Sequence, residues 1–208
     1  MKALLSTTYF GPVQWYQKLY RHDEVQIEQR ESFLKQTYRN RCLVATTQGI
    51  QALTVPIERG TSQLIKDIRI SDHGNWRHLH WNALVSAYGE SPFFEYYQDD
   101  IHPFFERRWA YLFDFNEAIR EKMCELLDIQ PKVSFTNSWV DISDNSVSSV
   151  NLDYADFREV INPKHPQLDP YFESKPYYQV YQQKHGFLPN LSILDLLFNM
   201  GPESIFYL

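Results

Sequence analysis

The chain has 208 residues, of which 43% are hydrophobic, 22% charged and 16% aromatic. This length and composition are typical of one folded domain and argue against a disordered chain, and so many aromatic rings must fill a core or line a cleft. The formal net charge of −6 argues against nucleic-acid binding, because recognition of a phosphate backbone usually needs a strongly basic face.

Two features bear on the cellular compartment. Cys42 and Cys124 are the only cysteines, and a single pair gives no disulfide framework. The opening MKALLSTTYFGP has too short an apolar run for a signal peptide, and no stretch approaches the roughly 18 apolar residues of a membrane helix. We therefore expect a soluble, cytoplasmic protein without membrane insertion.

The start of the chain predicts a β-α-β unit. KALLSTTYF is apolar and β-branched like a strand, and Pro12 suits the first turn of a following helix. Tyr16 and Tyr20 then recur at helical spacing, and DEVQIEQ alternates like a second strand. A helix that begins directly after a strand presents free N–H groups to anions, although Pro12 removes one donor.

A cationic segment precedes a predicted β-hairpin. KQTYRNRC contains Lys35, Arg39 and Arg41, and RCLVATTQGIQALTVPIE predicts two strands that turn at Gln48-Gly49. If the first strand is already extended at Arg39, its period of two sends both guanidinium groups to one face and Asn40 to the other. QLIKDIRI adds a further strand candidate.

Residues 74–127 predict a series of packing helices. Asp72 is a candidate cap for the first helix, which Gly89 ends. Ser91 is a candidate cap for the next, and residues 113–127 carry apolar side chains at helical spacing.

The remainder predicts less regular structure before a final helix. KVSFTNSW is strand-like, DISDNSVSSVN is polar like a loop, and residues 151–190 predict an ordered, irregular segment on the surface, where it could cover a cleft. PNLSILDLLFNMGPES predicts a buried helix capped by Asn190, and its Asp195 needs a partner because burying an unpaired charge costs several kcal/mol.

These patterns predict an α+β or α/β single domain over residues 1–208. It has a β-α-β opening, a β-hairpin, a helical middle and a buried C-terminal helix. Residues 72–128 are a candidate helical subdomain.

Four blocks in this order resemble the WbqC-like protein family, especially its Bacteroidetes members: TTYFGPVQWYQKL, KQTYRNRC, LTVPI and SPFFEYY. The ending GFLPNLSILDLLFNMGPE is similar to endings in that branch, so the resemblance covers nearly the whole chain. It rests on the order and spacing of the blocks. Many members begin with His-Gln-Pro, where this chain has Ser6, Thr7 and Thr8, so a role of that histidine does not carry over.

The resemblance implies a transferase-like enzyme that acts on an activated sugar, linked to a nucleotide or phosphate, in cell-surface polysaccharide biosynthesis. An acyl, aminoacyl or glycosyl transferase is the type implied, because some members are encoded among enzymes that build or modify such polysaccharides. The alternative is a non-catalytic module that binds a sugar nucleotide or a partner. No cofactor is assigned. The blocks carry over these candidate substrate-binding positions: Tyr9, Lys18, Lys35, Arg39, Asn40, Arg41, and Pro92 with its aromatic followers.

Arg39 and Arg41 allow two interpretations. In the structural one, they pair with a core carboxylate, for which Asp195 is the natural candidate. In the functional one, two planar guanidinium groups and the Asn40 amide bind a phosphate or a sugar-nucleotide diphosphate.

His80 and Asp195 are the candidate catalytic acid–base groups. As a base, His80 needs a cleft and an orienting carboxylate, and the alternative is a partly buried structural histidine. His78 and His80 would point about 200° apart on a helix, so they would not share a metal ion, and no metal site is predicted.

Overall fold

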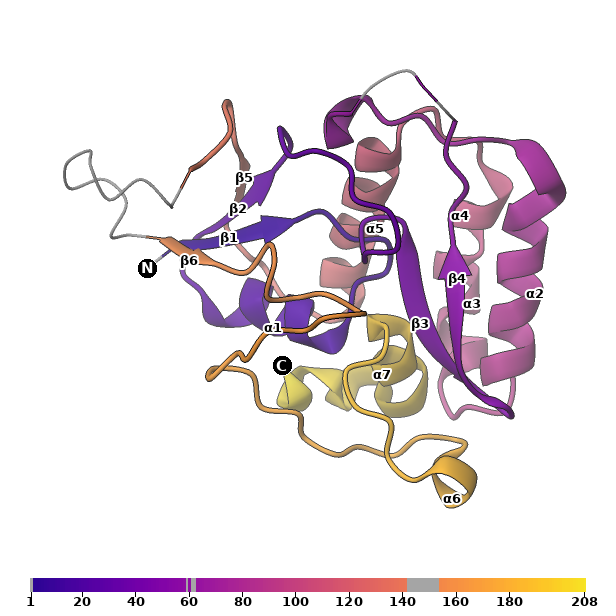
Figure 1. The fold of residues 1–208 in the computed structure, drawn as a ribbon. Coiled ribbons are helices and arrows are strands. Elements are labelled where there is room, and N and C mark those ends of the chain that lie inside the picture. The colour runs from indigo at the N-terminus through magenta and orange to yellow at the C-terminus, as the bar shows by residue number, and fades with distance from the viewer. Residues whose placement is uncertain (1, 59, 61–62, 142–153) are drawn as a thin grey trace.

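The computed structural model describes residues 2–58, 60, 63–141 and 154–208 (Figure 1). The loop predicted from DISDNSVSSVN therefore lies almost entirely outside the described residues. The fold is mixed α+β, with one four-stranded parallel sheet and one small antiparallel sheet.

The main sheet has the strand order β5-β2-β1-β6. Its members are β1 (Lys2–Ser6), β2 (Val25–Glu28), β5 (Val133–Phe135) and β6 (Tyr154–Asp156). Ala3 pairs with Val25 on one side and with Ala155 on the other, so β1 is a central strand. Parallel neighbours need a crossover connection, and α1 (Val13–Arg21) supplies it between β1 and β2. The predicted β-α-β opening is confirmed.

Helix α1 packs against the sheet in Figure 1 and is buried from Val13 to Leu19. Pro12 was predicted in the first turn, but it lies one position earlier as the N-cap residue, in an extended conformation. Lys18 and Arg21 fall in the last turn, where cations are favoured by the negative end of the helix dipole. This placement brings two cations to one end of a helix whose body is in the core.

The predicted hairpin is confirmed as β3 (Arg41–Thr46) and β4 (Gly49–Thr54), which pair antiparallel and pack against α2 and the C-terminal helix. The strand predicted from QLIKDIRI is wrong. Residues Ile65–Asp67 form a 3-10 turn, and the buried residues Ile65, Ile68 and Ile70 are spaced by three and then two positions, so one alternation does not run through the stretch. The backbone hydrogen bonds of this stretch go to several separate segments, one of which contains Ala110. No single strand pairs with it, so it does not form a β-ladder.

The helical middle is also confirmed. It consists of α2 (Trp76–Tyr88), α3 (Phe94–Ile101), α4 (Pro103–Glu106) and α5 (Leu112–Leu126). Gly89 follows α2 as predicted, but the two predicted caps are wrong. Asp72 precedes a short 3-10 turn, η2 (His73–Asn75), and its carboxylate pairs with Arg77 at 2.7 Å. The turn at Ser91 delays α3 until Phe94, whose N–H bonds to the Ser91 carbonyl.

The C-terminal helix α7 (Ile193–Met200) is buried, as predicted. Its N-cap is Ser192, whose hydroxyl accepts from the Leu194 N–H at 3.3 Å, and not Asn190, whose amide binds Gln14 instead. Gly201 takes a positive φ of 54° and ends the α-helix, after which η4 (Gly201–Tyr207) continues as a 3-10 helix.

Between β6 and α7 the chain is irregular except for α6 (Gln182–His185), in line with the prediction for this region. Within the described residues, no helix has both the length and the apolar character needed to cross a membrane.

Candidate functional site

The last turn of α1 carries a buried ion pair. Lys18 is 1% exposed, and its Nζ lies 2.6 Å from Asp169 Oδ2 and 4.4 Å from the centre of the Phe157 ring. Gln14 Nε2 donates to the same carboxylate oxygen at 2.9 Å. Burial alone would raise the pKa of Asp169, but the Lys18 ammonium and the Gln14 amide outweigh burial and hold that pKa below its usual value. Asp169 therefore stays charged and offsets the cation that α1 carries inward.

This ion pair attaches an irregular segment, residues 169–173, across α1. We call this segment the strap. Its far end is also bonded to α1, because Gln17 Nε2 donates to the Glu173 carbonyl at 2.9 Å. The Tyr171 N–H donates to the second oxygen of Asp169, at 3.1 Å, which fixes the turn between them. The strap therefore has two attachment points on one helix.

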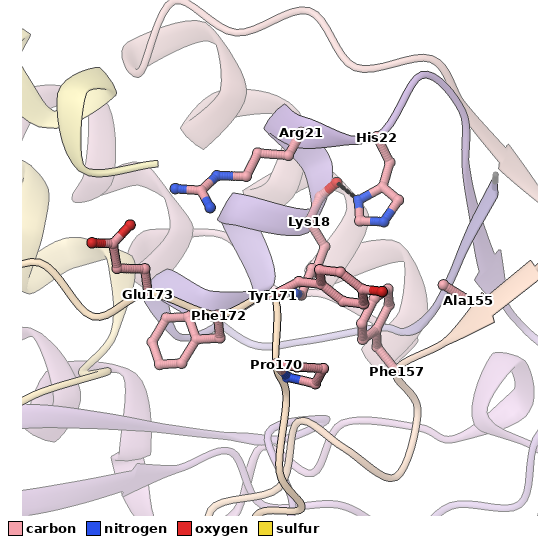
Figure 2. A pocket seen from close by; sticks show the side chains of 9 residues that line it. All are labelled: Lys18, Arg21, His22, Ala155, Phe157, Pro170, Tyr171, Phe172 and Glu173. Carbon is pink, nitrogen blue, oxygen red and sulfur yellow. Dashed lines mark hydrogen bonds between the residues drawn. The ribbon is translucent and has the colours of Figure 1, made fainter.

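A pocket of about 560 Å³ lies between the end of α1, β6 and the strap. Figure 2 shows its lining, which comprises Lys18, Arg21, His22, Ala155, Phe157, Pro170, Tyr171, Phe172 and Glu173. Ligand pockets typically have about 300–1,000 Å³ and combine a mainly apolar lining with a few convergent polar groups. We call this cavity the α1 pocket, because its polar groups come mainly from that helix and the residue after it.

Arg21 stands on the rim of the α1 pocket. Its Nη2 donates to the Leu208 carbonyl at 2.9 Å, and in Figure 2 its guanidinium group extends toward the side of Glu173. No side-chain carboxylate forms an ion pair with Arg21 within the described residues. Guanidinium groups carry five N–H donors, so most of those of Arg21 remain for a ligand.

His22 is the residue that ends α1. The Lys18 carbonyl accepts hydrogen bonds from its backbone N–H and from its ring Nδ1, at 3.3 and 3.1 Å. Because a carbonyl oxygen only accepts, Nδ1 carries the hydrogen and Nε2 keeps its lone pair. Burial, helped by the nearby Lys18 ammonium, lowers the pKa of His22. The pocket thus contains a neutral imidazole in a fixed tautomer, with its Nε2 edge turned away from the Lys18 carbonyl (Figure 2).

Arg39 lies elsewhere, at the carboxyl end of β1. It is 4% exposed, its Nε donates to Glu31 Oε1 at 2.8 Å, and its Nη2 contacts Glu31 Oε2 and Ser6 Oγ. The structural interpretation named the wrong partner, because Glu31 and not Asp195 pairs with Arg39. Asp195 instead accepts from three neutral donors on surrounding elements, namely Tyr88 and Tyr177 hydroxyls and the Gln179 amide, at 2.9, 2.7 and 2.8 Å.

Arg41 does not share a site with Arg39. Residue 39 lies in a turn before β3, so the alternation expected for an extended chain does not reach it. Arg41 Nε donates across the hairpin to Thr54 Oγ1 at 3.1 Å. Asn40 is buried with its amide on the Val55 carbonyl, and Lys35 is exposed. The predicted convergence of both guanidinium groups is wrong.

Tyr9 and His80 form a buried contact of their own. The Tyr9 hydroxyl lies 2.9 Å from His80 Nδ1, and the two side chains are 0% and 7% exposed. Burial lowers the pKa of His80 to about 4, so the ring stays neutral. This placement fits the structural alternative for His80, since a phenol and not a carboxylate orients the ring. Asp195 is fully buried as well, and burial raises its pKa.

Of the predicted substrate-binding residues, Lys18 alone lines the α1 pocket among the residues that the structure describes. Sequence reasoning missed the rest of its lining. The run KLYRH at the end of α1 was the available signal, because it places Lys18 and His22 four residues apart on one helical face. The strap had no such signal. Among the described residues, no three His, Cys, Asp or Glu side chains gather as metal ligands would.

The chain is similar in sequence to other proteins over most of its length. Residues 7–207 match the model of the WbqC-like protein family. The chain is 30% identical over 207 residues to "Uncharacterized protein Rv1507c" of Mycobacterium tuberculosis, and the alignment covers 89% of this chain and 87% of that protein. No solved structure matches the chain significantly. The family match therefore includes the three segments that form the α1 pocket, namely the end of α1, β6 with Phe157, and the strap.

Proposed function

We propose that this chain, which belongs to the WbqC-like protein family, binds a phosphorylated or nucleotide-linked sugar in the α1 pocket and acts on it as a transferase-like enzyme. The setting we propose is cell-surface polysaccharide biosynthesis. One observation carries the proposal: a cavity of about 560 Å³ joins the cationic end of a helix to walls made of aromatic rings.

The cationic end suits the anionic part of such a ligand. Arg21 has donors free of protein partners, and a guanidinium group binds phosphate oxygens in pairs. Lys18 is already paired with Asp169, which offsets its charge, so Arg21 is the cation that remains for a direct contact. The aromatic walls, including the 73% exposed ring of Tyr171, suit the apolar face of a sugar ring.

His22 supplies the acid–base group. In a transfer reaction its Nε2 takes the proton of a ligand hydroxyl while that oxygen attacks the donor group, and the donor's leaving group departs with the bonding electron pair. A base works best when it is unprotonated at the working pH, and the lowered pKa of His22 meets this condition. The Lys18 carbonyl holds the ring in the required tautomer.

A non-catalytic binding module is the second candidate. It is favoured by Ser6, the last residue of β1, and by Thr7 and Thr8 directly after it, where many relatives are expected to have His-Gln-Pro. Ser6 is committed to Glu31 and Arg39 there. In this case the α1 pocket binds the same ligand without converting it.

Thermal-shift screening tests the proposal. Nucleotide sugars, sugar phosphates and inorganic phosphate are added to the native chain, to Arg21→Gln and to the control Arg41→Gln, which changes an arginine outside the pocket. A ligand at about 100 times its Kd adds about 2.7 kcal/mol to the unfolding free energy, which gives a measurable rise in Tm. We expect the rise in the native chain and in the control, and its loss in Arg21→Gln.

Two results would contradict the proposal: no rise with any phosphorylated compound, or an equal rise in Arg21→Gln. Mass spectrometry after long incubation with acyl, aminoacyl and glycosyl donors then separates the two candidates. A stabilising ligand that gains or loses a group supports the enzyme, and one that stays unchanged with every donor class supports the binding module.

A further inference from the structure

A second cavity, of about 330 Å³, lies at the carboxyl edge of the main sheet. Most of its lining residues follow β2, β5 or β6 in the sequence, and Arg39 joins them through its bond to Glu31. The lining comprises Arg30, Glu31, Ser32, Leu34, Arg39, Trp139 and Glu159. The strand β1 lies between its successor β2 and the late strand β6, so the strand order changes direction there. In open parallel sheets, ligands bind outside the carboxyl ends of the strands at such a change. We call this cavity the edge pocket.

Arg30 brings an unused cation to the edge pocket. Its Nε is buried without a hydrogen-bond partner, and within the described residues its side chain forms no ion pair. The other arginine, Arg39, is already bound to Glu31 and Ser6. Leaving a buried donor unpaired costs about 1–3 kcal/mol, and more when the group is charged. Because the Nε atom itself is buried, a ligand would meet the guanidinium through its Nη groups, for which the described residues supply no ion-pair partner either.

Glu159 brings an unused anion to the same pocket. It is exposed, and the described residues place no cation against its carboxylate. Glu31 is not available, because it accepts from Arg39 and Ser6. A ligand with only a negative charge would be attracted by Arg30 but repelled by Glu159. A ligand with only a positive charge would be attracted by Glu159 but repelled by Arg30. The free charges therefore favour a ligand that carries both signs.

Trp139 adds an apolar surface beside these charges. The residue is 52% exposed, and the Arg158 guanidinium lies over its ring at 4.2 Å from the ring centre. Arg158 is held in place by Asp156 and Glu28, so one side of the ring is fixed. The exposed part of the ring remains for a hydrocarbon group of a ligand.

We propose that the edge pocket binds a small zwitterion of the α-amino-acid type. Its carboxylate binds Arg30, its ammonium group binds Glu159, and its side chain packs on Trp139. This proposal does not depend on the function of the α1 pocket. The two cavities are nevertheless close to one small chamber of about 10 Å³, which shares Phe157 with the α1 pocket and Arg39 with the edge pocket. The buried, unpartnered hydroxyls of Thr7 and Thr8 line that chamber.

Proton–nitrogen NMR of the arginine side chains tests the proposal in the full chain. Arg30→Lys identifies the Arg30 Nε signal, and the twenty common amino acids are then titrated at millimolar concentrations. We expect at least one amino acid to shift this signal. Its N-acetyl and methyl-ester derivatives each lack one charge and should bind about tenfold more weakly or worse.

Three variants distinguish the contributions. Isothermal titration calorimetry measures binding in the variants, because Arg30→Gln lacks the Arg30 Nε signal. Arg30→Gln should abolish binding, and Glu159→Gln, which changes an exposed side chain, should weaken binding of the amino acid but not of its N-acetyl derivative. Arg41→Gln is the control and should bind normally. Circular dichroism and Tm confirm that each variant is folded.

Either of two results overturns the inference. In the first, no amino acid shifts the Arg30 signal. In the second, the N-acetyl derivative binds as tightly as the amino acid, which would indicate a plain anion site. Arg21→Gln should still bind the amino acid in the edge pocket even when it no longer binds a phosphorylated ligand in the α1 pocket. Each proposal can therefore be contradicted without the other.

Discussion

The Lys18 ammonium lies 2.6 Å from the Asp169 carboxylate, with 2% of each side chain exposed, and this pair joins α1 to the strap. The two residues come from distant parts of the sequence. Because the strap forms one wall of the α1 pocket, the ion pair helps to hold that wall against α1, together with the bond from Gln17 to the Glu173 carbonyl. A buried pair of this kind gives little net stability, yet breaking it leaves a buried charge uncompensated.

Lys18→Met should therefore lower the free energy of unfolding by about 3–5 kcal/mol, because Asp169 would remain without its cation. The double variant Lys18→Met with Asp169→Leu should recover much of this loss, since it leaves neither charge. Urea denaturation measures both. As a control, Glu24→Gln breaks the exposed pair of Lys2 and Glu24 and should leave the unfolding midpoint nearly unchanged. Equal losses in the single and double variants would contradict the role given to the pair.

Arg39→Ala separates a structural role from a ligand-binding one. Glu31 would lose both of its guanidinium bonds in the interior, so we expect a loss of about 3–5 kcal/mol in the free energy of unfolding. A phosphorylated ligand should still raise the Tm of this variant above the Tm of the same variant without ligand, because Arg39 does not line the α1 pocket. A stable Arg39→Ala chain without ligand response would restore the predicted anion-binding role of Arg39.

Tyr171→Ala tests the aromatic wall. The ring is 73% exposed, so its removal should hardly change Tm in the absence of ligand. If it stacks on the sugar, the ligand should bind about tenfold more weakly, as the loss of about 1–1.5 kcal/mol would produce. Tyr178→Ala is the matched control, because that ring is 52% exposed and does not line the pocket. Isothermal titration calorimetry gives both affinities, and equal values would remove Tyr171 from the site.

The pH dependence of stability should reveal His80. Its folded pKa of about 4 lies below the usual value of 6.5, so the unfolded state binds the extra proton. The contribution is fully present above pH 6.5 and is lost as the pH falls toward 4, by roughly 3 kcal/mol at most. Asp169 also stabilises the folded state less as the pH falls, at lower pH than His80, because its pKa in the folded state is lowered as well. In His80→Asn, urea denaturation from pH 7 to 4 should show a shallower decline, and an unchanged slope would contradict this assignment.

Local patterns in the sequence predicted much of the fold. The strands β1 and β2, the hairpin and the helices all depend on periodicity or turn residues within a few positions, which a sequence displays directly. The strand proposed near Ile65 failed because its apolar residues face the core without a partner strand, a fact set by segments far away in the chain.

Most of the candidate site required contacts that the sequence does not encode locally. Lys18 was identified, but Asp169 and Tyr171 lie in an irregular segment without periodicity, so their return to α1 had no sequence signal. One of the two interpretations of Arg39 paired it with a core carboxylate, named as Asp195, and the structure shows such a pair with Glu31 instead. Asp195 does not need Arg39 as a partner, because the uncharged hydroxyl groups of Tyr88 and Tyr177 already donate hydrogen bonds to it. These contacts depend on tertiary packing and cannot be read from the sequence.

His22→Asn tests the proposed base. Asparagine retains an N–H donor for the Lys18 carbonyl but lacks the Nε2 lone pair, so ligand binding should persist while turnover falls by about 10²–10⁴-fold. In the native chain the rate should decline as the pH falls through the lowered pKa of His22, because protonation consumes that lone pair. This decline should be absent from the residual rate of His22→Asn. A variant that turns over at the native rate, or loses binding together with turnover, would show that His22 shapes the pocket without acting as the base.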